Sequence, residues 1–161
     1  KTNGNINDNK TIKITSNSIH NSSRHPKNLV DFSSSNVYQS KDDGDAIICF
    51  DFKSMFVQLS SYSILSCNSN DNGAHLKNWV IEVSNDGKLW TEVDRNENSA
   101  VLRGPYKCVN FNVLQQTKDF FRFIRLRQTG ESWWYMGEHN YLTLCSIDFY
   151  GKLKYSIDYT Q

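Results

Sequence analysis

Candidate metal ligands occur in the 161-residue chain, but their spacing does not build a metal site. Residues 68–73 (NSNDNG) resemble the start of a calcium-binding loop, in which oxygen ligands alternate along the chain. The alternating ligands here are neutral amides, and the twelfth position is Trp79, where such a loop needs a bidentate Glu. The acidic run 42–45 (DDGD) is typical of a solvated turn. We therefore expect neither a metal nor a cofactor.

Catalytic motifs are also missing from the sequence. It contains no phosphate-binding loop, no nucleophile elbow and no HExxH zinc motif. A zinc cluster requires histidines that converge in a defined geometry, whereas the four in this chain are scattered over expected loops: His20, His25, His75 and His139. The sequence therefore predicts a domain that is not an enzyme.

Charge and hydropathy exclude two classes of partner. The chain has 18 basic and 17 acidic residues, so it lacks the excess of Lys and Arg with which proteins neutralise nucleic-acid phosphates. Its longest apolar run, residues 46–50, is far shorter than the ~18 residues of a membrane span. We expect no nucleic-acid partner and no transmembrane segment.

Two adjacent tryptophans are the most conspicuous candidates for a binding surface. Trp133 and Trp134 lie in the segment 129–140, which is otherwise polar and which we expect to be a loop. Aromatic side chains in such a loop either cap the core or face a partner, and one can point inward while its neighbour points outward. Trp79 and Trp90 fall instead in the predicted hairpin 78–94, and we expect both in the core.

The elements that must position these residues are strands. Alternating apolar and polar residues predict eight strands, at 11–15, 45–52, 55–65, 78–84, 88–94, 106–113, 120–128 and 141–150. The alternation slips near residues 60–61, which indicates a β-bulge. Asn85-Asp86-Gly87 predicts a hairpin turn in which Gly87 has positive φ, and Gly151 is expected to close the last strand. The pattern favours an antiparallel sandwich or barrel.

The cysteines indicate the cellular compartment in which the protein resides. Cys49 and Cys145 lie in apolar strand segments, and no pair has the CxxC spacing of redox or zinc motifs. We expect four reduced thiols and an intracellular, cytoplasmic protein. A secreted origin stays open, because the sequence also contains Asn-x-Ser/Thr sequons at Asn9 and Asn21.

Five segments, taken in order, resemble discoidin domains, the type C domains of coagulation factors five and eight. They are AIICFDFK (46–53), YSI (62–64), HLKNWVIEVSNDGKLW (75–90), FRFIRL (121–126) and IDFYG (147–151). The resemblance implies an all-β, eight-stranded antiparallel jelly-roll sandwich of the galactose-binding-like type. It covers residues 11–153, with a polar tail at 1–10 and a second tail at 154–161.

The resemblance also implies a setting and a binding face. No Cys lies near either end of the matched region, as in discoidin domains of large intracellular multidomain proteins. Discoidin domains hold both chain ends at one pole and bind ligands with loops at the other. This places loops 16–28, 38–45, 66–76 and 129–140 at the binding pole. The candidate ligand-binding residues in them are His20, Arg24, His25, Tyr38, Lys41, His75, Trp133, Trp134 and His139.

We therefore expect a non-catalytic module, monomeric in isolation, that recognises a protein or peptide partner through this pole. The alternative is a lectin-like domain that stacks a glycan on the loop aromatics. Binding of phospholipid through the same loops is a weaker alternative, because these loops hold few basic residues for an anionic surface.

Overall fold

A computed structural model describes residues 4–31, 33–134 and 139–156 of the chain. Two short 3-10 helices, η1 (Ser22–Arg24) and η2 (Pro26–Val30), follow the first strand. Within the described ranges there are nine strands: β1 (Lys13–Ser16), β2 (Tyr38–Gln39), β3 (Ile47–Asp51), β4 (Met55–Ser66), β5 (Trp79–Ser84), β6 (Thr91–Asn96), β7 (Cys108–Asn112), β8 (Phe123–Gln128) and β9 (Thr143–Tyr155).

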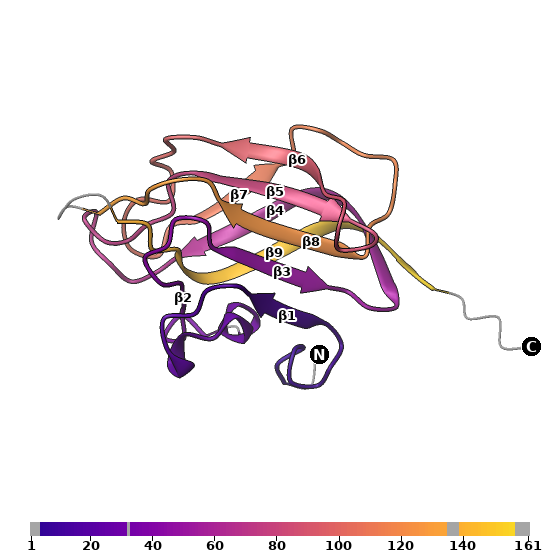
Figure 1. Ribbon diagram of the computed structural model, residues 1–161, viewed down its shortest axis with the longest axis horizontal. Helices are drawn as coiled ribbons and strands as arrows, with labels where there is room; N and C mark the ends of the chain where they lie inside the picture. Colours follow the sequence, from indigo (N-terminus) through magenta and orange to yellow (C-terminus); the bar gives the residue numbers. More distant parts are fainter. Residues whose placement is uncertain (1–3, 32, 135–138, 157–161) are drawn as a thin grey trace, which may run out of the picture.

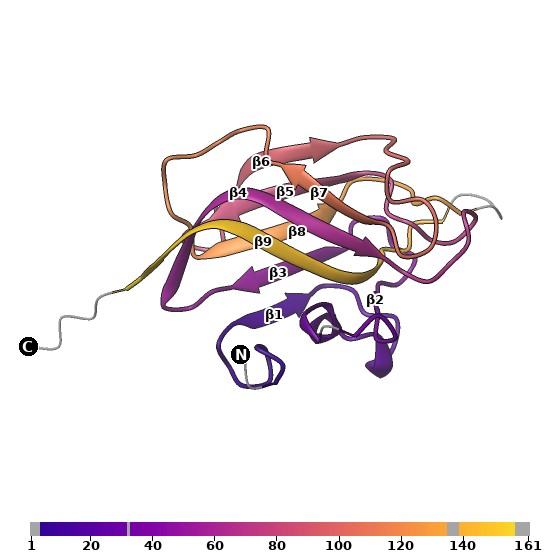
Figure 2. The same cartoon turned by 180° about the vertical axis from the view of Figure 1, so that it is seen from behind.

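The strands form two layered sheets (Figures 1 and 2). One sheet has the order β1-β3-β8-β5-β6 and the other β2-β9-β4-β7, and every strand pair is antiparallel. The predicted all-β antiparallel sandwich is confirmed. The strand beyond the predicted eight is β2, which has two residues and pairs with the start of β9. So short a strand leaves no alternation in the sequence.

The predicted bulge in β4 is confirmed. The register with β9 shifts between Leu59 and Ser61, and this places both Leu59 and Tyr62 in the core. Gly151 lies opposite, where an added Cβ would be 2.0 Å from the carbonyl oxygen of Gln58. The expectation that Gly151 closes the last strand is wrong, because β9 continues pairing with β4 to Tyr155. Glycine is required here for close backbone approach at the bulge.

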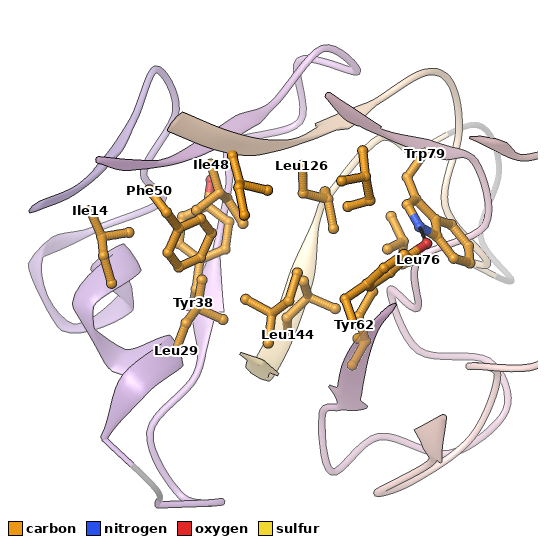
Figure 3. Close-up of a cluster of buried hydrophobic side chains, with 14 of the residues drawn as sticks. Ile14, Leu29, Tyr38, Ile48, Phe50, Tyr62, Leu76, Trp79, Leu126 and Leu144 are labelled. Carbon is orange, nitrogen blue, oxygen red and sulfur yellow. Dashed lines mark hydrogen bonds between the residues drawn. The ribbon is translucent and has the colours of Figure 1, made fainter. Parts of the chain in front are cut away.

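The core lies between the sheets, and Trp79 and Tyr62 meet at its centre (Figure 3). Trp79 Nε1 donates a hydrogen bond to Tyr62 Oη at 3.0 Å, and Tyr62 Oη donates to the Asp94 carboxylate at 2.5 Å. The Phe111 ring stacks on Tyr62 at a centroid distance of 5.0 Å. These contacts join β4 and β7 of one sheet to β5 and β6 of the other, with the buried polar groups paired.

The hairpin turn is confirmed, but its second strand starts late. Gly87 has φ of 69°, as the turn requires. The Asp86 carboxylate accepts hydrogen bonds from the backbone N–H groups of Lys88 and Leu89, both at 2.8 Å. This widens the turn, so β6 begins only at Thr91.

The expectation that Trp90 is a core residue is wrong. Its side chain is half-buried, and the Arg125 guanidinium lies 3.9 Å from its ring centroid. Arg125 also pairs with Glu82 on the same sheet. Trp90 therefore packs against a charged surface of the sheet rather than inside the sandwich.

Candidate ligand-binding site

Loops from distant parts of the chain meet where β4 ends and β9 begins, at the opposite end of β9 from Tyr155 (Figure 1). The Ser18 hydroxyl donates a hydrogen bond to the Asp43 carboxylate at 2.5 Å, which joins the first two loops. His75 and Trp133 exchange backbone hydrogen bonds, which joins the other two. We call this end, with loops 16–28, 38–45, 66–76 and the described part of 129–140, the loop pole; residues 135–138 lie outside the described part.

A cavity of about 380 Å³ opens at the loop pole. Its apolar lining comes from Val37, Cys67 and Ala74, which are buried. Arg24 and Trp134 line it from two of the predicted loops, and both are half-buried. A concave site with an apolar floor and a few polar groups is typical of small-ligand and side-chain pockets.

Two buried thiols, Cys67 in the cavity lining and Cys145 behind it in the same buried cluster, are unreactive. Cys67 and Cys145 pack with Val37 in a small buried cluster. Desolvation raises the pKa of Cys67, and it raises the pKa of Cys145 to about 11. Both thiols are therefore protonated at neutral pH, and they contribute packing rather than a nucleophile. All four cysteines of the chain are free in the structure, with Cys49 half-buried and Cys108 exposed.

Thr143, the first residue of β9, contributes an unpaired polar atom to the cavity. Its side chain lines the cavity, yet Thr143 is only 7% exposed. Its hydroxyl is buried and has no hydrogen-bond partner within the part of the chain that the structure describes. Buried polar groups are nearly always paired in folded proteins, so this hydroxyl is an exception within the core of the domain.

Arg24 brings a positive charge to the same cavity. It ends η1, whose first turn is capped by the side chain of Asn21. None of the ion pairs found among the described residues involves its guanidinium. The predicted site residue Arg24 is thus placed with its charge available to a ligand.

The two tryptophans of the pole have different environments. Trp133 Nε1 donates a hydrogen bond to the carbonyl oxygen of Ser99 at 2.7 Å. The Lys77 ammonium and the Arg103 guanidinium lie over the Trp133 ring, 4.5 and 4.7 Å from its centroid. Trp133 therefore fastens its loop to the sandwich. Trp134 lines the cavity, and its ring contacts His139 and Tyr141 at centroid distances of 5.9 and 6.3 Å.

Two predicted site residues are buried instead of presented to a ligand. Tyr38 is fully buried and donates a hydrogen bond to the carbonyl oxygen of Ser18 at 2.7 Å. Burial raises the pKa of its hydroxyl to about 12. His75 is also fully buried, with Nε2 2.8 Å from the carbonyl oxygen of Asn70. Both side chains therefore stabilise the loop pole from its interior.

The remaining predicted residues lie on the pole but outside the cavity lining. His20 is exposed, and its ring contacts Tyr141 at 6.3 Å. Lys41 is exposed, and His139 is hydrogen-bonded to the Asp42 carboxylate. His25 caps η2, where its Nδ1 accepts from the backbone N–H of Lys27 at 3.1 Å. Of the predicted residues, Arg24 and Trp134 are the ones that the structure brings together at the cavity.

Sequence reasoning missed several lining residues, including Tyr106 and Thr143. Tyr106 precedes β7 and has φ of 50°, unusual for a residue other than glycine. Strand alternation alone would have placed the loop before β7 at this pole, because successive connections in the antiparallel order change ends. Nothing in the sequence marks Thr143, whose environment arises from the pairing of β9 with β2.

Within the ranges that the structure describes, no three His, Cys, Asp or Glu side chains gather into a potential metal site. Helices in those ranges are too short and too polar to cross a membrane.

Comparison with known proteins relates the chain to segments of much larger proteins. No family model matches it. It is 28% identical over 146 residues to the E3 ubiquitin-protein ligase hecd-1 of Caenorhabditis elegans, which is 89% of this chain and 5% of that protein. It is 29% identical over 80 residues to the E3 ubiquitin-protein ligase Ufd4 of Drosophila melanogaster, 48% of this chain and 3% of that protein. The chain therefore spans a small fraction of either relative.

Solved structures show the fold. CBM32-3 from a family 31 glycoside hydrolase of Clostridium perfringens superposes with a TM-score of 0.70 and 18% identity, covering 90% of this chain and 94% of that one. At this level of identity the likeness concerns architecture alone. The chain thus has the galactose-binding-like β-sandwich fold found in carbohydrate-binding modules, and a distant sequence relationship to segments of E3 ubiquitin ligases.

Proposed function

We propose that the chain is a non-catalytic recognition module of the discoidin type, which binds a peptide segment of a protein partner in the cavity at the loop pole. The observation that carries this proposal is the cavity itself, which combines the Trp134 ring, the Arg24 guanidinium and the unpaired Thr143 hydroxyl. Trp and Arg are the side chains most often found at the energetic centre of protein interfaces.

The size of the cavity fits this function. A volume of about 380 Å³ accommodates one or two amino-acid side chains, which is how peptide segments anchor on a rigid domain. Hydrogen bonds such as that between Ser18 and Asp43 hold the loops of the pole in place. Ligand binding should therefore cost little conformational entropy.

The distant relatives support a protein partner. Both are ubiquitin-protein ligases, enzymes whose substrates are proteins, and this module resembles only a small part of each. We propose that the chain serves a larger intracellular protein of this kind by holding a protein substrate or regulator. In isolation we expect a monomer.

A glycan is the second candidate ligand. It is favoured by the fold shared with CBM32-3 and by the aromatic ring of Trp134 at the cavity. Carboxylates accept the strongest hydrogen bonds from sugar hydroxyls, however, and the described lining residues include none. The missing carboxylate therefore favours a peptide over a glycan.

Selection of displayed random peptides, run beside a glycan array, tests the proposal. We expect peptides that bind the domain and lose at least about tenfold in affinity on Trp134→Ala, the usual penalty for an aromatic anchor. Trp90→Ala is the matched control, because it removes the same ring from the surface of the other sheet. Glycan-array binding without any selected peptide would refute the peptide proposal.

A further inference from the structure

We infer that the group seated in this cavity is an oxyanion on a peptide side chain, a carboxylate or a phosphate, held by the Arg24 guanidinium and the Thr143 hydroxyl. The inference rests on the proposed function, because it specifies the chemistry of the peptide group that enters the same site.

The charge of the lining is the first argument. Among its described residues the cavity has one cationic side chain, Arg24, and no acidic one. Neutral hydrogen-bonding side chains complete the polar lining, among them Ser34, Asn68 and Ser69. The buried thiol of Cys67 adds no negative charge, since desolvation raises its pKa. A guanidinium surrounded by neutral donors favours an anion over a cation or a neutral group.

Arg24 differs from the other arginines of the chain. Arg95, Arg122, Arg125 and Arg127 each form ion pairs with carboxylates of the same domain. Arg103 donates a hydrogen bond to the carbonyl oxygen of Asp71 at 2.7 Å and lies over the Trp133 ring. Arg24 alone among the described arginines has no such partner and faces a cavity instead.

Thr143 supplies the second anchor, independently of charge. Thr143 lines the cavity, and its buried hydroxyl has no hydrogen-bond partner among the described residues, so it has a proton to donate to an entering oxygen. An oxyanion has several lone pairs and accepts from a guanidinium and a hydroxyl at once. A carboxylate or phosphate therefore satisfies both unpaired groups, whereas a neutral amide leaves the guanidinium without a counter-charge.

The test is an NMR titration of the ¹⁵N-labelled domain with three capped tripeptides, acetyl-Gly-X-Gly-amide, in which X is Glu, phosphoserine or Gln. We expect saturable shifts at Arg24 and Thr143 with an anionic peptide, and at least about tenfold weaker binding of the neutral Gln peptide, as for charge-assisted hydrogen bonds elsewhere. Comparison of the Glu and phosphoserine arms identifies which oxyanion the cavity prefers.

Variants distinguish the contacts made by Arg24 and Thr143 from a general attraction between the anionic peptide and the positive charges of the domain. Arg24→Gln is expected to lower the affinity for the preferred anionic peptide by at least about tenfold. Thr143→Val, which keeps the shape of the side chain, is expected to lower this affinity by about threefold or more. Lys88→Gln removes an exposed cation from the turn between β5 and β6, and we expect less than a twofold effect.

Two results would overturn the inference. The first is equal binding of the Glu, phosphoserine and Gln peptides, or no saturable shift with any of them. The second is anion binding that is insensitive to Arg24→Gln. In either case, the proposed function would still hold if display-selected peptides bind in a way that depends on Trp134. Binding of glycans alone would contradict both the inference and the proposed function.

Discussion

Nδ1 of His139 lies 2.6 Å from Oδ2 of Asp42, and this contact joins two loops that are 97 residues apart in the sequence. The other carboxylate oxygen of Asp42 accepts a hydrogen bond from the backbone N–H of Asn140, also at 2.6 Å. His139 in turn stacks on Tyr141 and contacts Trp134. One carboxylate therefore secures the aromatic part of the loop pole beside the cavity.

This contact predicts a pH-dependent contribution to stability. Hydrogen bonds from His139 and Asn140 lower the pKa of Asp42 below its ordinary value. A carboxyl whose pKa is lower in the folded state stabilises it above the unfolded-state pKa, and this stabilisation is lost as pH falls through the folded-state value. Asp42→Ala should therefore lower the melting temperature at neutral pH, with a difference that shrinks below about pH 4.

Thermal unfolding of wild type and variant across this pH range checks the prediction. Asp45→Ala is the control, since it removes an exposed carboxylate of the same loop that has no hydrogen bond or ion pair to any described residue. An Asp42 effect that is absent, or equal in size at pH 7 and pH 3, would contradict this role.

Trp79→Ala should destabilise the domain severely. Trp79 is fully buried, and its indole N–H is bonded to Tyr62 inside the core. Loss of the ring leaves a cavity and an altered polar network, with an expected cost of about 3–5 kcal/mol. Denaturant unfolding measures this cost, and an unchanged midpoint would show that Trp79 is not central to the core.

Gly151→Ala tests the bulge. A methyl group at this position meets the carbonyl oxygen of Gln58 at 2.0 Å, so the backbone of β4 or β9 has to move. We expect a loss of about 1–3 kcal/mol, typical of forced packing. Lys152→Ala, at the next and exposed position of the strand, should be nearly neutral in the same denaturation experiment. Equal stability of the two variants would argue against the close approach at Gly151.

Asp148→Asn should stabilise the domain at neutral pH. Desolvation raises the pKa of this half-buried carboxyl, and no ion pair or hydrogen bond to it is found among the described residues. Because its pKa is higher in the folded state, stability falls as pH rises from the unfolded-state value through the folded-state one. An Asn side chain does not ionise, so the variant avoids this loss of stability. Its melting temperature should exceed that of the wild type at pH 7, and the difference should be smaller near pH 3. A less stable variant at pH 7 would show that the carboxylate has a favourable partner.

The predictable part of the fold rests on local periodicity and turn chemistry. Alternation placed the longer strands, and Gly87 and the slip near Ser60 identified a turn and a bulge, because each depends on neighbours in sequence. The periodicity does not say which side of a sheet faces the core. Trp90 matches a discoidin position in the hairpin and is expected in the core, yet it lies on a charged outer surface.

The candidate site was less predictable, because it is assembled from side chains distant in sequence. The loop pole followed from a resemblance and from strand alternation, but the environments of single residues did not. Tyr38 and His75 are polar loop residues by sequence, and the structure buries both. Thr143 gains its significance only from its place in the cavity lining and from a buried hydroxyl that no described residue pairs with.

The most direct test of the account is amide chemical-shift mapping of the domain with a display-selected peptide. Binding in the cavity predicts that the largest shifts cluster at Arg24, Ser69, Trp134 and Thr143, and that they diminish on Trp134→Ala. Largest shifts on the outer face of the four-stranded sheet, around Asn110 on β7, with the loop pole unaffected, would contradict it.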